Sequence, residues 1–239
     1  MIEFIRTSSQ KIPIPANNML NNVAGCCLSS WIYHYTISPS GGGAGDRIFS
    51  ENTETTAGRA RAQIGINQYH ALYCGARTQD GDPSVYWDAT VALALNTLYF
   101  VAVNFDFVNR LIYSYINGIY SETSPAQSWT AGNTNGANSL AAYIGSSSDG
   151  TSRFFDGKIE DIRIYNRMLS ANEIKTLYCS QGRDAMWNNL VGQYTTRGKH
   201  DGFVDTGAEP VVNLFNSAYK GQPIAGMVWK SSPLNWRKN

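Results

Sequence analysis

Apolar and polar residues alternate along many short stretches of this chain, with turn-forming residues between them. A period of two is typical of β-strands that bury one face, because successive side chains of a strand point to opposite sides. Several short strands of this kind predict an all-β protein. The predicted strands lie at residues 2–14, 20–35, 47–50, 61–73, 98–107, 111–116, 119–122, 140–145 and 157–165, and Asn67-Gln68 is a possible turn within 61–73.

The stretch over residues 2–14 alternates weakly and contains Pro13, with Pro15 just beyond it. Proline has no N–H to donate to a neighbouring strand, so it is found mainly at sheet edges. We therefore expect a single first strand that ends at an edge.

Two dipeptides predict hairpin turns. Asn117-Gly118 separates two alternating stretches and gives the clearest hairpin in the chain, and Asp156-Gly157 gives a second hairpin signal. Asn, Asp and Gly accept the positive φ angles that a two-residue turn requires. We expect each pair to join two neighbouring antiparallel strands.

The strand that follows Gly157 does not keep one phase. Ile162 and Ile164 share a face, but Ile159 falls on the other face if the alternation is regular. A change of phase within a strand indicates a bulge or an edge, because a slip of one residue moves every side chain to the opposite face. We place this irregularity near Glu160.

A helix is predicted directly after this strand, ending near Tyr178. Ser170 and Glu173 have the spacing of a capping box, in which the serine oxygen accepts from the third helical N–H and the glutamate bonds back. Leu169 and Ile174 flank this cap at the positions of a hydrophobic staple. The helix is therefore expected to begin at the cap and to dock one apolar side.

Residues 155–174, FDGKIEDIRIYNRMLSANEI, join the turn, the strand and the capped helix in one run. This run resembles the closing strand and helix of laminin-G-like, concanavalin A-like jelly rolls. Residues 28–32 and the hairpin within 111–118 resemble other strands of the same family. The resemblance implies a two-sheet antiparallel β-sandwich, a jelly roll, over residues 1–180. A fold of this kind has many functions, so the resemblance implies shape more than activity.

The pattern changes after residue 180. Apolar residues within 183–196 recur at helical spacing and predict a second amphipathic helix. Residues 198–239 have no sustained period, so we interpret 181–239 as a C-terminal helix plus an extended arm that packs on the sandwich or on a neighbouring subunit. Large aromatic side chains are costly to leave in water, so they are the expected partner-binding residues of this arm. These are Trp187, Phe203, Phe215, Trp229 and Trp236.

Part of the arm has its own resemblance. Leu190-Val191 and the segment 211–223 are similar to C-terminal tails that follow jelly rolls in phage-encoded proteins. The resemblance implies a virion protein whose partners are capsid or other virion proteins.

Composition limits the classes of partner. The net charge is +1 and only 15% of residues are charged, so no electrostatic argument supports nucleic acid or an acidic membrane surface. No apolar run approaches the length of a membrane span, and residues 1–15 show no signal-peptide core. We therefore expect synthesis in a host cytoplasm, and the resemblance to phage-encoded proteins implies a location on the virion surface.

The four cysteines are Cys26, Cys27, Cys74 and Cys179, and no C-x-x-C pair occurs. Zinc is therefore not expected. We interpret the cysteines as reduced and mostly buried thiols, and a pairing of Cys74 with Cys179 stays open.

No catalytic motif is found. The E-x-D-x-x-E strand motif of β-glucan hydrolases is absent, and Glu160 and Asp161 are adjacent, so their carboxylates should point to opposite faces of a strand. The three histidines have no neighbouring nucleophile motif. We expect no enzymatic activity and no cofactor.

Two kinds of ligand remain open. Calcium prefers loop carboxylate and amide oxygens, and the weak candidate ligands are Asn104, Asp106 and Asp149. Sugars bind aromatic faces with polar neighbours, and the glycan candidates are Tyr86, Trp87, Asp88 and Trp129, although a core role for the two tryptophans is the preferred interpretation.

Two functional hypotheses follow. The first is a non-enzymatic capsid decoration or head-surface protein with a lectin-like fold, assembled as a homo-oligomer and held by its arm. The alternative is a carbohydrate-binding adhesion module that recognises host or environmental glycans. A glycosidase or polysaccharide lyase has no supporting motif in the sequence.

Overall fold

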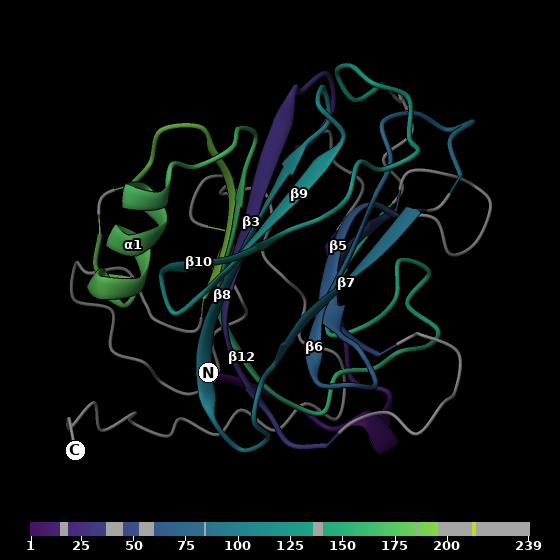
Figure 1. The fold of residues 1–239 in the computed structure, drawn as a ribbon. Coiled ribbons are helices and arrows are strands. Elements are labelled where there is room, and N and C mark those ends of the chain that lie inside the picture. The colour runs from purple at the N-terminus through teal and green to yellow at the C-terminus, as the bar shows by residue number, and fades with distance from the viewer. Residues whose placement is uncertain are drawn as a thin grey trace.

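The computed structural model describes residues 1–14, 19–36, 45–52, 60–83, 85–135, 141–184, 186–195 and 212–213. Two antiparallel sheets form the layers of a sandwich, and one α-helix lies on the outside of the larger sheet (Figure 1). The all-β, two-sheet fold expected from the sequence is confirmed.

The helical segments are η1 (Arg6–Ser8), a single 3-10 turn, and α1 (Ala171–Ser180). The strands are β1 (Ile2–Phe4), β2 (Ile12–Ile14), β3 (Gly25–His34), β4 (Asp46–Asn52), β5 (Ala60–Ile66), β6 (Ala71–Ala76), β7 (Val85–Ala92), β8 (Leu98–Asp106), β9 (Leu111–Ile116), β10 (Ile119–Thr123), β11 (Ala142–Ile144), β12 (Gly157–Tyr165), β13 (Leu190–Thr195) and β14 (Val212–Asn213).

The larger sheet has the strand order β10-β9-β8-β3-β12-β13-β14, with β1 also paired to β12. The smaller sheet has the order β2-β11-β4-β5-β6-β7. Apolar side chains from the inner faces of both sheets form one core, because every second side chain of a strand points between the sheets. The outer face of each sheet is therefore left for other contacts.

The first stretch of the chain does not form the single strand expected from its alternation. Residues 2–14 divide into β1, which pairs with β12 in the larger sheet, and β2, which pairs with β11 in the smaller sheet. A 3-10 turn separates them, and Ser9 takes a left-handed conformation with φ 51° at its end. The short segment thus crosses from one layer to the other.

One predicted hairpin is confirmed and the other is wrong. Ile116 pairs with Ile119 around Asn117-Gly118, whose φ angles are 52° and 75°. Asp156-Gly157, in contrast, follows a segment that leaves β11 in the smaller sheet and enters β12 in the larger sheet. The turn signal therefore marks a crossover between layers, because a dipeptide does not determine which strands pair.

The irregularity predicted near Glu160 is confirmed as a β-bulge. The register of β12 against β3 shifts between Glu160 and Arg163, and Asp161 has φ 49°. The extra residue restores the phase, so Ile159, Ile162 and Ile164 all enter the core. The change in sequence phase is thus the consequence of one inserted residue.

The capping box and staple of α1 are confirmed. The Ser170 Oγ accepts from the Glu173 N–H at 3.3 Å, and the Glu173 Oε2 accepts from the Ser170 N–H at 2.8 Å. Ile174 is buried together with Leu169 in a second apolar cluster that includes Trp31. The helix therefore covers part of the outer face of the larger sheet (Figure 1).

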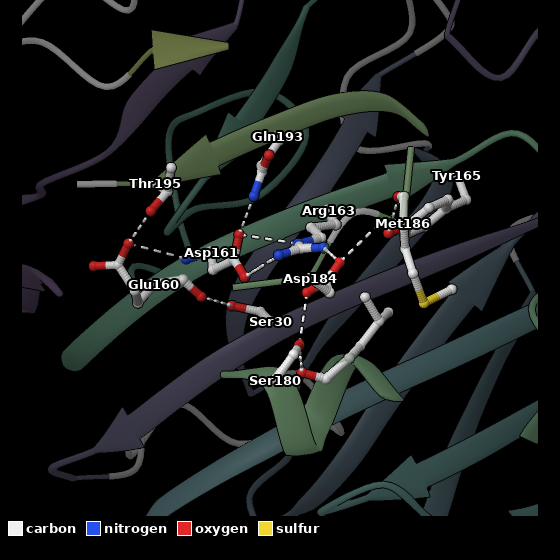
Figure 2. Close-up of polar contacts among 11 residues, drawn as sticks. Ser30, Glu160, Asp161, Arg163, Tyr165, Ser180, Asp184, Met186, Gln193 and Thr195 are labelled. Carbon is white, nitrogen blue, oxygen red and sulfur yellow. Dashed lines mark hydrogen bonds and ion pairs between the residues drawn. The ribbon is translucent and has the colours of Figure 1, made fainter. Parts of the chain in front are cut away.

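The second helix predicted within residues 183–196 is wrong, because the chain forms β13 there and pairs antiparallel with β12. Figure 2 shows the buried polar contacts beneath this pairing. The Arg163 Nη1 pairs with Asp184 at 2.6 Å and its Nη2 pairs with Asp161 at 2.9 Å. The Gln193 Nε2 donates to Asp161 at 2.6 Å, so β13 is tied to the same carboxylate. Residues 190–195 are therefore part of the sandwich and do not belong to an arm.

The C-terminal aromatics predicted for the arm are placed in part. Trp187 lies before β13 and is about half exposed. Phe203, Phe215, Trp229 and Trp236 lie outside the described residues.

All four cysteines are free thiols, and Cys26, Cys27 and Cys74 are buried while Cys179 is exposed. Burial raises the pKa of each buried thiol, which keeps them protonated and unreactive.

Candidate functional site

The glycan candidates named from the sequence point in different directions. Tyr86 and Asp88 are exposed on the outer side of β7, whereas Trp87 between them packs against the core. Trp129 is only 1% exposed, and its Nε1 donates to the Phe107 carbonyl at 3.1 Å. Trp129 therefore cannot serve as a surface platform, and the structure separates it from Tyr86.

The outer face of the smaller sheet brings Tyr86 together with residues from three other strands. Strand pairing aligns Arg47, Gly65, Tyr73 and Asp88 in one row across β4, β5, β6 and β7. The next outer row contains Tyr143, Ser50, Gln63, Gly75 and Tyr86. We call the side chains of these two rows the tyrosine face.

Aromatic stacking connects the two rows. The rings of Tyr73 and Tyr86 lie 5.2 Å apart between centroids at an interplanar angle of 31°. The Arg47 Cζ lies 3.8 Å from the centroid of the Tyr73 ring, in the geometry of a cation–π contact. A guanidinium, a buried tyrosine and a 45%-exposed tyrosine therefore form a continuous series on one face.

Gly75 makes this stacking sterically acceptable. A Cβ at this position would lie 2.6 Å from the Gln63 Nε2 and 2.8 Å from the Tyr86 ring. The absence of a side chain lets Gln63 and Tyr86 approach each other across β6. Burial raises the pKa of Tyr73, which stays neutral and keeps a hydroxyl that can donate.

Asp88 supplies the carboxylate of the face and is held in place. Its Oδ1 accepts from the Asn67 Nδ2 at 2.9 Å. The Asn67 Oδ1 in turn accepts from the backbone N–H groups of Tyr69 and Ala71, which orders the turn between β5 and β6. The arrangement of an exposed ring beside a fixed carboxylate can stack on the apolar side of a sugar and accept from its hydroxyl groups.

Sequence reasoning missed Arg47, Gln63 and Tyr73. The signal that could have identified them is the period of two itself, since each lies on the polar phase of its strand. What the sequence lacked was the order of the strands, which brings these residues to the same side as Tyr86.

A pocket of about 320 Å³ lies where β3 begins and β8 ends. Its charged residues already have partners within the protein. The Asp106 carboxylate accepts from the backbone N–H and Nδ2 of Asn109, and Arg167 pairs with Glu173 at 2.7 Å. The lining residues are Ala24, Gly25, Asp106, Val108, Asn109, Asn166, Arg167 and Met168.

The calcium candidates are engaged in local contacts. Asn104 donates to the Leu169 carbonyl at 2.7 Å and accepts from the Leu169 N–H at 3.0 Å, which anchors the segment before α1. The Asp149 carboxylate accepts from Ser147 and from the Thr151 N–H within its own turn. Within the ranges that the structure describes, no three His, Cys, Asp or Glu side chains form a group that could hold a metal ion.

The adjacent acidic residues of β12 are buried structural groups. Glu160 accepts from the Thr195 hydroxyl at 2.6 Å, and Asp161 pairs with Arg163. Both carboxylates are under 6% exposed, so neither is available to a substrate at the surface.

Comparison with known proteins identifies the fold family. Residues 6–175 match the model of the concanavalin A-like lectin/glucanases superfamily, which is more than half of the chain. No curated protein matches the sequence. In the part of the chain that the structure describes, no helix has the length and apolar character of a membrane span.

Solved structures share this fold at low identity. A Bacteroides ovatus protein provisionally described as carbohydrate binding has a TM-score of 0.57 and 18% identity over 83% of this chain and 53% of its own. The CBM40 of the Ruminococcus gnavus IT-sialidase, bound to α2,3-sialyllactose, has a TM-score of 0.51 and 17% identity over 65% of this chain and 83% of its own. The heptameric SAP-like pentraxin of Limulus polyphemus has a TM-score of 0.51 and 16% identity over 80% of this chain and 89% of its own. The chain thus spans about half the length of the Bacteroides protein.

Proposed function

Because the chain belongs to the concanavalin A-like lectin/glucanase superfamily, we propose that it is a carbohydrate-binding module whose ligand occupies the tyrosine face. The observation that carries the proposal is the exposed Tyr86 ring, stacked on Tyr73 and flanked by Asp88 on one sheet face. An exposed ring fixed from below presents a rigid apolar surface at low entropic cost, which suits the weakly polar face of a sugar. Two of the solved structures with this fold are described as carbohydrate-binding proteins, which supports the proposal.

The module acts without catalysis in this proposal. Glu160 and Asp161 are buried in structural contacts, and the tyrosine face has one carboxylate, Asp88, in its two rows. Glycoside hydrolysis ordinarily needs a pair of carboxyl groups on either side of the bond. Incubation with β-glucans, chitin and sialosides should therefore release no reducing sugar, and turnover that persists after repurification would contradict this part of the proposal.

The test of binding compares two exposed tyrosines. Tyr86→Ala should weaken glycan binding by tenfold or more in glycan-array titration and calorimetry, which corresponds to about 1.4 kcal/mol. Tyr120→Ala is the matched control, because Tyr120 is 52% exposed and also contacts a neighbouring tyrosine, Tyr115, but lies on β10 of the larger sheet. Equal losses in the two variants, or no glycan binding by the unaltered protein, would refute the proposal.

The virion hypothesis stays a prediction. It depends mainly on the arm, most of which lies outside the described residues, and no comparison bears on a capsid partner, a virion location or a homo-oligomer. Glycan binding is compatible with such a location. Co-sedimentation of the protein with particles from its source would test it directly.

A further inference from the structure

Arg47 on the tyrosine face is a buried cation, and in the part of the chain that the structure describes no carboxylate pairs with it. Its Nε donates to the Gln63 Oε1 at 3.1 Å and its Nη1 donates to the Gly45 carbonyl at 3.0 Å, and both acceptors are neutral. Among the described residues, nothing accepts from its Nη2 and no carboxylate lies within ion-pair distance of it. Arg163 and Arg167, in contrast, each pair with a carboxylate within 2.9 Å.

This arrangement leaves the guanidinium without a paired carboxylate among the described residues, at a site with little water. Arg47 is 2% exposed, and burial of a charge without a counter-charge is unfavourable. The pKa of Arg47 is lowered to about 10, chiefly by burial and also by the charge of Arg153, while Tyr73 and, more weakly, Tyr86 and Asp46 act in the opposite direction. The guanidinium nevertheless stays protonated at neutral pH, so it contributes positive charge to the face from beneath its surface.

Arg153 adds a second guanidinium to the same region. Its carbonyl accepts from the Arg47 N–H at 3.0 Å, which places the two residues side by side. Its charge is close enough to lower the pKa values of both Arg47 and Tyr73. No hydrogen bond or ion pair from the Arg153 side chain to another described residue is present.

The carboxylates of Asp46 and Asp88 do not pair with Arg47 or Arg153. The Asp46 carboxylate binds Arg6 and His34. Asp88 lies at the other end of the row that begins at Arg47, three strands away, which is roughly 14 Å at the usual strand spacing. The arginine end of the tyrosine face is therefore positive, and the Asp88 end is negative.

We infer that the tyrosine face binds glycans that carry an anionic group, a carboxylate or a sulfate ester, with Arg153 holding the anion, Arg47 adding positive charge from beneath it and Tyr86 holding the sugar ring. The inference rests on the proposed function. Tyr73 contacts both Arg47 and Tyr86, so one tyrosine ring separates the anion site from the stacking site. Guanidinium groups are well suited to planar carboxylates and to sulfate-type oxyanions, because their donors form a rigid fork.

The test is calorimetric titration with lactose, sialyllactose, sulfated lactose and a glucuronate-containing disaccharide, at low and at high salt. We expect one or more anionic glycans to bind tenfold or more tighter than lactose, with a preference that falls at high salt because added ions screen the charges. Arg153→Gln and Arg47→Gln should each bring the ratio of anionic to neutral affinity toward one. Arg110→Gln is the matched control, because Arg110 is exposed in the loop before β9 and should leave the ratio unchanged.

Arg153 is only partly buried, so its variant keeps the test decisive if Arg47→Gln fails to fold. Equal affinity for lactose and all anionic glycans would overturn the inference and leave the proposed function intact. A preference that survives in the Arg153 variant, or that is lost equally in the Arg110 variant, would also overturn it. A preference for only the sulfated or only the carboxylated glycans would support it and identify the anion. If Tyr86→Ala alone leaves all binding unchanged, the proposed site fails together with the inference.

Discussion

Removing the positive charge from the buried cluster on β12 should strongly destabilise the sandwich. Arg163 is 2% exposed and pairs with Asp161 at 2.9 Å and with Asp184 at 2.6 Å. Burial alone would lower the pKa of Arg163, but these two carboxylates raise it well above its usual range. Arg163→Met would fill most of the volume but would leave two buried carboxylates without a cation. Loss of one partner of a buried ion pair typically costs about 3–5 kcal/mol.

The remaining contacts reduce this cost somewhat. Asp161 keeps its hydrogen bond from Gln193, and Asp184 keeps its bond from the Ser180 hydroxyl. We therefore expect a loss of about 3–4 kcal/mol, which is a large share of the roughly 5–15 kcal/mol that stabilises a typical domain. Urea unfolding followed by tryptophan fluorescence measures this loss from the midpoint and the slope.

The matched control is Arg167→Met. Arg167 pairs with Glu173 at 2.7 Å, but the two side chains are 28% and 32% exposed, so we expect a loss below about 1 kcal/mol. Asp161→Asn added to Arg163→Met should recover part of the lost stability, because it neutralises one of the orphaned carboxylates. A loss in Arg163→Met no larger than in the control, or no recovery in the double variant, would refute this account of the cluster.

Three further predictions concern the core and α1. Trp129→Ala should cost about 3–5 kcal/mol in urea unfolding, as large aromatic truncations in a core do, and a folded variant that instead loses only glycan binding would contradict its placement. Ser170→Ala should cost about 1 kcal/mol and Ile174→Ala about 2–4 kcal/mol, so thermal melts should show the second variant to be clearly the less stable; equal effects would mean that α1 is not docked. Hydrogen bonds from Arg167 lower the pKa of Glu173 from 4.5 to about 2, so the folded state favours the charged form. Its contribution to stability is complete above pH 4.5 and is lost as the pH falls toward 2, and partial exposure keeps it below about 1 kcal/mol. Glu173→Gln should remove this part of the pH dependence, and an unchanged slope in the variant would exclude Glu173 as its source.

Local chemistry in the sequence determined the features that depend on a few consecutive residues. The Asn117-Gly118 turn requires two positive φ angles, and the box of Ser170 and Glu173 satisfies helix N–H groups within one turn, so neither needs a distant partner. The bulge near Glu160 was also predictable, because an alternation that changes phase has few other physical causes. These features, with the resemblance of residues 155–174, were sufficient to predict the sandwich.

Only the tertiary structure determined that residues 190–195 form a strand and not a helix. Its apolar spacing is compatible with a helix, but β12 has backbone N–H and C=O groups along the side that faces β13, and these groups need partners. Pairing with β12 satisfies them and places Gln193 against Asp161, which a helix at this position would not do. The apolar spacing of one segment contains no information about an unpaired strand edge that a distant segment forms.

The candidate site depends on strand order in the same way. Tyr86 and Asp88 were named from the sequence as glycan candidates, although no strand was predicted around them, and Arg47, Gln63 and Tyr73 join them only because β4, β5, β6 and β7 are neighbours in this order. Trp129, which looks equally suitable in sequence, is excluded because its loop places the ring in the core. A sequence states which side chains share a face of one strand, and the pairing of strands determines which faces meet as one surface.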